Sequence, residues 1–394
     1  MKLAMIGFGQ AGGKILDRFL EYDERTGSNI VRASVAVNTA KADLMGLEHV
    51  PQENRVLIGQ SRVKGHGVGA DNELGAEIAE EDIDEIQGAI DSIPVHEVDA
   101  FLIISGLGGG TGSGGSPVMA RHIKRIYTEP VYGLGVLPAG DEGGIYTLNA
   151  ARSFRTFVRE VDNLLVFDND AWRKSGESMQ GGYQQINDEI VTRFGILFGA
   201  GEVEQGGEVA ESVVDSSEII NTLAGGGIST VGYAAESVEE EKESGGLLSR
   251  FTGGGSENDL DSANTTNRIT SLVRKAALGR LTLPCKIENG AERALLVTAG
   301  PSAFLNRKGI ERGRKWLEEQ TGSMEVRGGD YPVEDSDKVA AVVLLSGVTD
   351  VPRIKELQQI AIEAQDNIDD IRGESEQNLQ ELVEDDDDEL EPLF

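Results

Sequence analysis

The sequence predicts an α/β protein with a mostly parallel sheet, a long central helix and a second α/β domain. In the N-terminal part of the chain, short apolar runs alternate with segments of helical periodicity. This alternation is typical of parallel strands buried between helices on both faces of a sheet. Glycine-rich turns follow several of the predicted strands. Because ligands of such sheets bind at the carboxyl ends of the strands, the turns mark the candidate site.

The predicted elements of the N-terminal domain follow one another at short intervals. Strands are expected at Lys2–Gly7, Val31–Val37, Asp99–Ser105, Val131–Leu137 and Asn163–Phe167. Their apolar, partly β-branched composition fits strands that are buried on both faces. Helices are expected at Ile15–Tyr22, Val118–Tyr127 and Ile145–Val161.

The C-terminal part of the chain begins with a longer helical pattern. A helix is expected at Tyr183–Phe198, where apolar side chains recur at near-helical spacing. Two strands, Ala294–Ala299 and Val339–Leu345, flank an amphipathic helix at Phe304–Gln320. These elements predict a second α/β domain. Residues 239–268 are polar and glycine-rich, so we expect a long loop there.

The domain organisation follows from these patterns. We expect an N-terminal domain that carries the glycine-rich turns at 1–182, the core helix and its connection at 183–205, a C-terminal domain at 206–350, and a C-terminal helix with an acidic tail at 351–394. The tail after Gly373 is expected to be disordered, because it is strongly charged and poor in apolar residues.

The strongly negative net charge of the chain argues against two classes of binding partner. The 394 residues include 68 acidic and 36 basic side chains, a formal net charge of −32. Such a surface repels phosphate backbones and anionic lipid headgroups, which argues against nucleic acid and membrane surfaces as general partners. Acidity spread over the folded body is typical of adaptation to high salt. The acidic tail is either a recruitment segment for a protein partner or a solvated end.

The lack of a long apolar run and the low cysteine content indicate where the protein is expected. No run approaches the roughly 18 apolar residues of a transmembrane helix, and the N-terminal residues 1–6 resemble a strand rather than a signal peptide. Cys285 is the only cysteine, so a disulfide framework within one chain is impossible and a cysteine-based metal site is not expected. We therefore expect a cytoplasmic protein with no integral membrane segment.

The first glycine-rich turn, residues 7–12, matches the pattern G-x-G-x-x-G. A strand-to-helix turn of this kind aims backbone N–H groups and a helix N-terminus at an anion. It is not a P-loop, because that motif would need glycine at Phe8 and Ser or Thr at Ile15. An NAD(P)-dependent oxidoreductase is one interpretation, although Asn38 stands where such enzymes usually place an acidic residue.

Two further glycine-rich loops favour a phosphate-rich nucleotide. The second loop spans Gly65–Asn72, and the third is Gly108-Gly109-Gly110-Thr111-Gly112-Ser113-Gly114. The third loop lies between a predicted buried strand and a helix, and its dense N–H donors can wrap phosphate oxygens. An oxidoreductase built on the first turn alone would leave both loops unexplained.

The third loop resembles the phosphate-loop signature of the tubulin/FtsZ superfamily. Gly9-Gln10-Ala11-Gly12 is similar to the first-loop motif of tubulins, while the second loop and the Asn38-Thr39 turn resemble their counterparts in FtsZ. The likeness runs in the same order through nearly all of the folded chain. With the high acidity, it makes the chain most similar to CetZ, the tubulin-like cytoskeletal family of haloarchaea.

The resemblance implies a Rossmann-like GTPase domain that binds GTP or GDP with Mg²⁺ at the carboxyl edge of the sheet. Mg²⁺ would be held through the phosphates, with Gln10 or Asp71 near it. The positions that correspond to the family's phosphate-side residues are Gln10, Ala11, Gly12, Gly13, Lys14, Asn38, Ala70, Asp71, Gly108, Gly109, Gly110, Thr111, Gly112 and Ser113.

Four later positions correspond to the family's nucleoside-binding residues. Glu142 resembles the acidic residue that holds the ribose, and Asn169 resembles the asparagine that reads guanine. Tyr183 and Asn187 are spaced i, i+4 on one helix face, so that the ring would stack on the base while the amide reads its edge. Alternatively, both asparagines cap turns and Tyr183 belongs to the core.

The resemblance also places a pair of catalytic carboxylates. FtsZ carries an Asn-x-Asp-Phe-Ala-Asp motif after the core helix, and Asp215 and Glu218 fall at its acidic positions, while Val213 replaces the leading Asn. In the family these residues reach from one subunit into the nucleotide pocket of the next and orient the attacking water. Asp215 also suits a helix N-cap with Glu218 as its capping-box partner.

The leading hypothesis is therefore a self-polymerising cytoskeletal GTPase that controls cell shape or motility, in the cytoplasm and at the cell periphery. An FtsZ-like cell-division filament is one alternative. A non-catalytic GTP-binding regulator is another, because Val213 and Tyr146 depart from the FtsZ pattern. Expected partners are further copies of the chain, head to tail and through lateral contacts, and a protein that binds the acidic tail.

Overall fold

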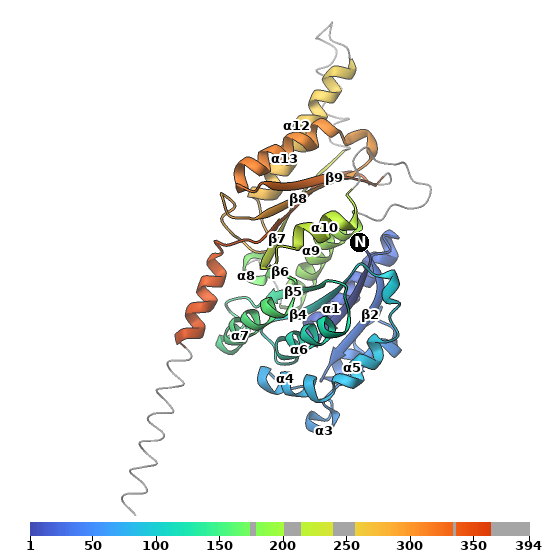
Figure 1. Ribbon diagram of the computed structural model, residues 1–394, viewed down its shortest axis with the longest axis vertical. Coiled ribbons are helices and arrows are strands. Elements are labelled where there is room, and N and C mark those ends of the chain that lie inside the picture. Colours follow the sequence, from blue (N-terminus) through green and yellow to red (C-terminus); the bar gives the residue numbers. More distant parts are fainter. Residues whose placement is uncertain (174–178, 201–213, 239–256, 334–335, 364–394) are drawn as a thin grey trace, which may run out of the picture.

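The computed structural model describes residues 1–173, 179–200, 214–238, 257–333 and 336–363. In this part of the chain one continuous sheet has the strand order β3-β2-β1-β4-β5-β6-β7-β10-β8-β9 (Figure 1). The strands are β1 (Leu3–Phe8), β2 (Val31–Asn38), β3 (Arg55–Leu57), β4 (Ala100–Gly106), β5 (Val131–Leu137), β6 (Asn163–Asp168), β7 (Ile228–Ser237), β8 (Arg293–Gly300), β9 (Glu325–Pro332) and β10 (Lys338–Ser346).

The sheet has a parallel part and a mixed part. From β3 to β7 every neighbouring pair is parallel. Strand β10 is antiparallel to both β7 and β8, and β9 is parallel to β8. Two register pairs between β6 and β7, Leu164 with Ile228 and Leu165 with Ser229, join the two parts. The later strands therefore extend the first sheet rather than forming a separate one.

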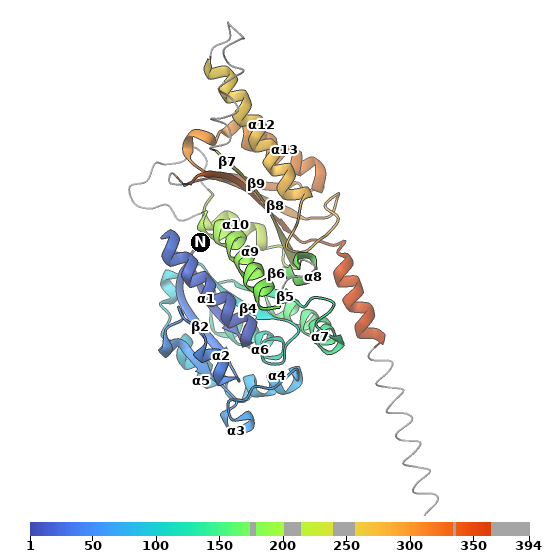
Figure 2. The same ribbon diagram turned by 180° about the vertical axis from the view of Figure 1, so that it is seen from behind.

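Helices cover both faces of the sheet (Figures 1 and 2). They are α1 (Gly9–Thr26), α2 (Lys41–Met45), α3 (Gln60–Val63), α4 (Asn72–Glu81), α5 (Ile83–Ile90), α6 (Thr111–Ile126), α7 (Gly144–Glu160), α8 (Asn169–Trp172), α9 (Met179–Gly199), α10 (Ser216–Leu223), α12 (Glu257–Leu278) and α13 (Arg307–Thr321). Residues 352–363 are also helical. Helices α1, α9 and α10 share one core with the sheet, and α4 to α7, α12 and α13 share the other.

The seven strands predicted from the sequence match the structure closely, because their apolar runs encode their burial, whereas β3, β7 and β9 have no predicted counterpart. In β1, Leu3 and Met5 belong to one core, whereas Ala4 and Ile6 belong to the other. A strand buried on both faces reads as a continuous apolar run. The strand predicted at residues 131–137 coincides with β5, and the other predicted strands lie within one residue of the observed ends.

Helix starts differ more from the prediction. Helices α1 and α6 begin at Gly9 and Thr111, inside the glycine-rich loops, and not at Ile15 and Val118 as expected. Glycine has a low helix propensity, but here close backbone packing overrides it. The loop expected at 239–268 is wrong from residue 257 onward, where α12 begins. Residues 257–268 contain no Gly or Pro, and α12 is anchored further along by buried side chains such as Ile269.

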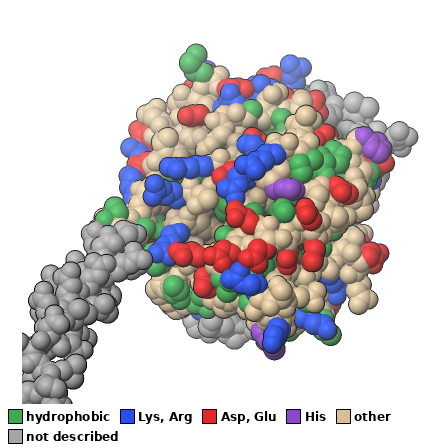
Figure 3. Space-filling view, turned by 60° about the horizontal axis from the view of Figure 1, so that its bottom comes forward, with side chains coloured by type: hydrophobic (Ala, Val, Ile, Leu, Met, Phe, Trp, Pro, Cys, Tyr) green, Lys and Arg blue, Asp and Glu red, His purple; other side chains and the backbone are tan. Residues whose placement is uncertain are grey.

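Opposite charges lie side by side on the surface. Figure 3 shows one face of the molecule, where Asp and Glu side chains form a band with Lys and Arg on both sides. Near the N-terminal domain's outer helices, Arg62 pairs with Glu77 at 3.1 Å and with Glu81 at 2.6 Å, and Arg121 pairs with Glu80 at 2.7 Å.

No helix in the described residues combines the length and apolar composition that crossing a membrane requires.

Candidate functional site

The first and third glycine-rich loops interlock at the carboxyl edge of the sheet. They follow β1 and β4, which are parallel neighbours. A Cβ atom at Gly12 would lie 2.1 Å from the carbonyl oxygen of Ile104, and one at Gly112 would lie 2.9 Å from that of Phe8. Gly9, with φ +72°, needs the left-handed conformation that glycine adopts easily. Glycine at these positions lets α1 and α6 begin side by side, with their unpaired N–H groups at one edge.

The third loop also packs against the second, but one of its glycines faces open space. A Cβ at Gly110 would lie 2.6 Å from the carbonyl oxygen of Gly69 and 2.8 Å from that of Asp71. A Cβ at Gly109 would meet no atom within 4 Å. Gly110 is therefore required by the fold, whereas the space beside Gly109 is available to a ligand.

The hydroxyl groups of Thr111 and Ser113 form hydrogen bonds at the first turn of α6. The Thr111 hydroxyl lies 2.7 Å from that of Thr39, which follows β2. The buried Ser113 hydroxyl donates to the carbonyl oxygens of Gly109 and Gly110. Ser113 thus stabilises the first turn with its side chain, and what it offers a ligand is its backbone N–H.

The second loop is held by an asparagine that no sequence motif marked. The buried side chain of Asn149, in α7, donates from Nδ2 to the Ala70 carbonyl oxygen at 2.6 Å and to the Gly108 carbonyl oxygen at 3.1 Å. It therefore fixes the second and third loops relative to each other. Asp71 is exposed and caps α4 by accepting from the Leu74 N–H at 3.0 Å.

A half-buried aspartate joins two of the predicted residues on the phosphate side. Asp43, in α2, accepts from Gln10 Nε2 and from Asn38 Nδ2, both at 3.1 Å. Asn38 Oδ1 in turn accepts from the Ala40 N–H. No sequence motif marks Asp43, which lies five positions beyond Asn38 at the end of β2. In the described residues, no group of three or more His, Cys, Asp and Glu forms a metal site by itself.

The predicted phosphate-side residues therefore come together. The three loops and the turn after β2 lie at one edge of the sheet, with Gly12 and Gly13 buried and Gln10, Ala11 and Lys14 exposed. This side of the sheet therefore offers a ligand mainly backbone N–H groups, together with the amide side chain of Gln10 and few charged side chains.

Two predicted nucleoside residues touch each other. Glu142, in the β5–α7 loop, accepts from the Ala139 N–H at 2.7 Å. The Tyr183 hydroxyl, in α9, hydrogen-bonds to Glu142, and burial together with the Glu142 charge raises the pKa of Tyr183 to about 12. Asn187 lies one turn further along the same helix, half-buried like Tyr183.

Asn169 holds a buried acceptor that has no partner. It is the first residue of α8 and 7% exposed, and its Oδ1 has no hydrogen-bond partner in the described structure. An unpaired buried oxygen is destabilising, and the N–H donors of a guanine would satisfy it. Asp168, which caps α8, is almost fully buried, and burial raises its pKa to about 6.

The candidate catalytic residues start helix α10. Asp215 is the N-cap, as the sequence predicts, and its carboxylate accepts from the Glu218 N–H at 3.1 Å and from the Ser217 hydroxyl. That hydroxyl bond is the main reason that the pKa of Asp215 is lowered. Burial and then the Asp215 charge raise the pKa of Glu218, against the opposing charges of Arg327 and Arg314. Val213 lies outside the described residues.

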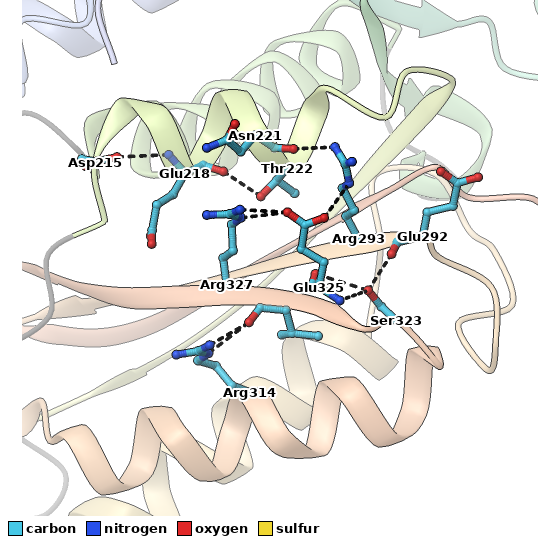
Figure 4. A network of polar contacts seen from close by, with 11 residues as sticks. Asp215, Glu218, Asn221, Thr222, Glu292, Arg293, Arg314, Ser323, Glu325 and Arg327 are labelled. Atoms are coloured by element: carbon cyan, nitrogen blue, oxygen red, sulfur yellow. Dashed lines mark hydrogen bonds and ion pairs between the residues drawn. The ribbon is translucent and has the colours of Figure 1, made fainter.

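An arginine network supports α10 from below. In Figure 4, Glu218 extends from α10 toward β9, on the side of Arg327. Arg327 pairs with Glu325 at 2.8 Å, Arg293 pairs with the other oxygen of Glu325 at 2.9 Å, and Arg293 also donates to the Asn221 carbonyl oxygen at 2.7 Å. The two carboxylates at the start of α10 therefore lie near ion-paired arginines of β8 and β9.

The catalytic and binding candidates lie at opposite edges of the sheet. The Ser216 hydroxyl, next to Asp215, donates to Asp99 at 2.9 Å, and Asp99 immediately precedes β4. The third loop follows the other end of β4, which spans seven residues, about 20 Å. The structure does not bring Asp215 and Glu218 to the glycine-rich loops of their own chain.

Comparisons with known proteins agree with this architecture. Residues 2–177 match the tubulin/FtsZ family GTPase domain, and residues 176–363 match the C-terminal domain of tubulin-like CetZ proteins. The tubulin-like protein CetZ1 of Haloferax volcanii is 80% identical over 94% of each chain. CetZ1 of this organism, solved as a GDP-bound monomer, has a TM-score of 0.82 at 74% identity, covering 93% of this chain and 100% of that one.

A second solved relative is an assembly. CetZ2 of Haloferax volcanii, solved as a GTPγS-bound protofilament, has a TM-score of 0.80 at 43% identity, covering 94% of this chain and 100% of that one. The two family matches, the fold and the identity to CetZ1 all indicate the same family. The chain belongs to the CetZ family of tubulin-like proteins and carries a tubulin/FtsZ GTPase domain.

Proposed function

We propose that this protein assembles head to tail and hydrolyses GTP at the contact between subunits. The observation that carries the proposal is the separation of the two half-sites at opposite edges of the sheet. A head-to-tail contact would place Asp215 and Glu218 of one copy against the glycine-rich loops of the next. The protofilament form of the CetZ2 relative and its GTPγS support this arrangement.

The residues of the site fit a guanine nucleotide. The N–H groups of the first and third loops would bind the phosphates, beside the open space at Gly109. Glu142 would accept from the ribose hydroxyls, and the ring of Tyr183 would stack on the base. The unpaired Oδ1 of Asn169 would accept from guanine. Gln10 or Asp71 would lie near Mg²⁺ held through the phosphates, and the ion would neutralise charge that develops during transfer.

The two carboxylates have complementary roles in the proposed reaction. Water oxygen attacks the γ-phosphorus, the bond to the β-phosphate oxygen breaks, and the water proton passes to a carboxylate. Glu218, whose pKa is raised by burial and by the Asp215 charge, suits the proton acceptor. Asp215, whose pKa is lowered chiefly by the Ser217 hydroxyl, stays ionised and orients the water.

The proposal predicts that activity depends on assembly. GTPase activity per subunit should rise with protein concentration in molar KCl, because an isolated chain lacks a complete site. Phosphate release at a series of concentrations, with sedimentation of the same samples, measures this. A rate per subunit that is independent of concentration would contradict the proposal. GTP binding without any turnover would instead indicate the non-catalytic regulator.

We infer control of cell shape or motility, at the periphery of the cytoplasm, as the process that the filament serves. Membership of the CetZ family supports this inference, whereas the site itself does not distinguish it from division. Localising a fluorescent fusion separates the two: we expect patches at the cell edge or poles, and a mid-cell ring would favour division. The acidic tail, one candidate for recruiting a protein partner, lies outside the described residues, and so do residues 239–256 of the expected loop.

A further inference from the structure

One buried arginine of the C-terminal helix makes polar contacts with the nucleoside side of the site. The helix of residues 352–363 lies beside α7 and α8, as Figures 1 and 2 show. Arg353 is 8% exposed, which is unusual for a charged side chain. Its Nη2 donates to the Pro138 carbonyl oxygen at 2.9 Å, its Nη1 donates to Glu356 at 2.8 Å, and its Nε lies 3.6 Å from Asp168 Oδ1.

These partners belong to the two loops that carry the proposed ribose and base contacts. Pro138 begins the loop in which the Ala139 N–H holds Glu142. Asp168 caps α8 and directly precedes Asn169. One guanidinium therefore contacts both segments, through the backbone carbonyl of Pro138 and through the side chain of Asp168. Within the described residues it forms no hydrogen bond or ion pair with Glu142 or Asn169.

The attachment of the helix itself does not depend on this arginine. Val351, Ile354 and Leu357 are 2%, 8% and 1% exposed and pack into the core. The apolar side chains thus dock the segment, while the contacts of Arg353 are directed at the two loops and at Glu356 of its own helix. Asp168 also needs the arginine, because a buried carboxylate without a cation is strongly destabilised.

We propose that Arg353 is a positioning residue for the nucleoside. It positions the base-reading amide of Asn169 through the side chain of Asp168, which caps α8, and the ribose-binding carboxylate of Glu142 through the Pro138 backbone. It thereby links the C-terminal helix to guanine nucleotide affinity. The inference rests on the proposed nucleotide site. Its consequence is that a change in the C-terminal helix alters how well the protein distinguishes guanine from related bases.

The test compares GDP with IDP, which lacks the 2-amino group of guanine. Binding of each is measured by calorimetry on the full chain in molar KCl, at concentrations too low for assembly. For Arg353→Gln we expect the Kd for GDP to rise about tenfold and the preference for GDP over IDP to shrink. Arg353→Lys keeps the charge but cannot make the same set of directed contacts, so it should shift both quantities in the same direction by less.

Glu356→Gln is the matched control. It changes an exposed partner of the same guanidinium and leaves the contacts with Pro138 and Asp168 in place, so binding should stay at the wild-type level. A role in folding alone would lower the melting temperature of the Arg353 variants without moving the GDP-to-IDP preference, and that result would overturn the inference. Failure of the unmodified protein to bind GDP would refute the nucleotide site itself, which is a separate outcome.

Discussion

Replacing Glu218 by glutamine is expected to lower GTP turnover of the assembled protein by at least about 100-fold, while nucleotide binding and assembly persist. Glutamine keeps the size of the side chain but cannot accept the proton of the attacking water. Glu218 lies away from the nucleotide loops of its own chain, so its loss leaves that pocket intact. Burial, and then the Asp215 charge, raise the pKa of Glu218, which makes it a stronger base than an ordinary exposed carboxylate.

The measurement pairs phosphate release from sedimented filaments with GTP binding by calorimetry. Asn221→Ala is the control, because Asn221 lies one turn later on α10 with an exposed side chain, and only its backbone carbonyl receives Arg293. Asp215→Asn adds a second test, since asparagine is also a good N-cap and the change therefore removes charge with little effect on the helix. Loss of GTP binding in Glu218→Gln would place Glu218 elsewhere, and unchanged turnover would exclude it from catalysis.

Local patterns in the sequence predicted seven of the ten described strands and the glycine-rich loops. A strand buried on both faces leaves an uninterrupted apolar run, and a loop packed against backbone leaves glycines at fixed spacing, so both are legible within about ten residues. The helix starts at Gly9 and Thr111 were not predicted, because both lie among these glycines. Glycine suggests a turn, and only the neighbouring loop in space shows that the helix continues through it.

Long-range partners could not be predicted. Asp43 joins residues 33 and 5 positions away, Asn149 joins loops 79 and 41 positions away, and Arg353 reaches Pro138 across 215 positions. Each is a polar side chain within or beside a helix, with no spacing that sets it apart from ordinary surface residues. Their positions depend on how the elements pack, and a single sequence does not contain that information in local form.

The separation of the half-sites was implied by family resemblance and has a physical basis in the topology. The two sides of the sheet in question are those where the strands begin and end. Parallel strands place all their carboxyl ends on one of these sides and all their amino ends on the other. Helix α10 reaches the other side, where its Ser216 meets Asp99 before β4. The proposed site is therefore complete only when two copies of the chain are in contact.

Replacing Gly109 by leucine is expected to weaken GTP binding about 100-fold, equivalent to about 3 kcal/mol, with the fold preserved. A Cβ at Gly109 meets no protein atom within 4 Å, so the new side chain occupies the space proposed for the phosphates. The free energy of unfolding should stay within about 1 kcal/mol of the wild-type value. Calorimetric binding of GTP and denaturant unfolding in molar KCl measure the two effects.

Gly110→Ala is the contrasting variant on the adjacent residue. Its single added methyl group would lie 2.6 Å from the Gly69 carbonyl oxygen and 2.8 Å from that of Asp71, so it should destabilise the fold by about 1–3 kcal/mol. If Gly109→Leu bound GTP as tightly as the wild type, the phosphates would not lie where the third loop opens. If it unfolded like Gly110→Ala, the space beside Gly109 would not be free.

Mixing Gly109→Leu with Glu218→Gln then tests the shared site directly. Each variant alone should hydrolyse almost no GTP, one for lack of bound nucleotide and the other for lack of a proton acceptor. In a mixed filament, a Glu218→Gln pocket that holds GTP can receive the intact α10 of a Gly109→Leu chain. Random copolymers at equal amounts would form such contacts at about a quarter of all interfaces, so partial activity should return. A catalytic site completed within one chain would give no recovery, because neither variant contains one.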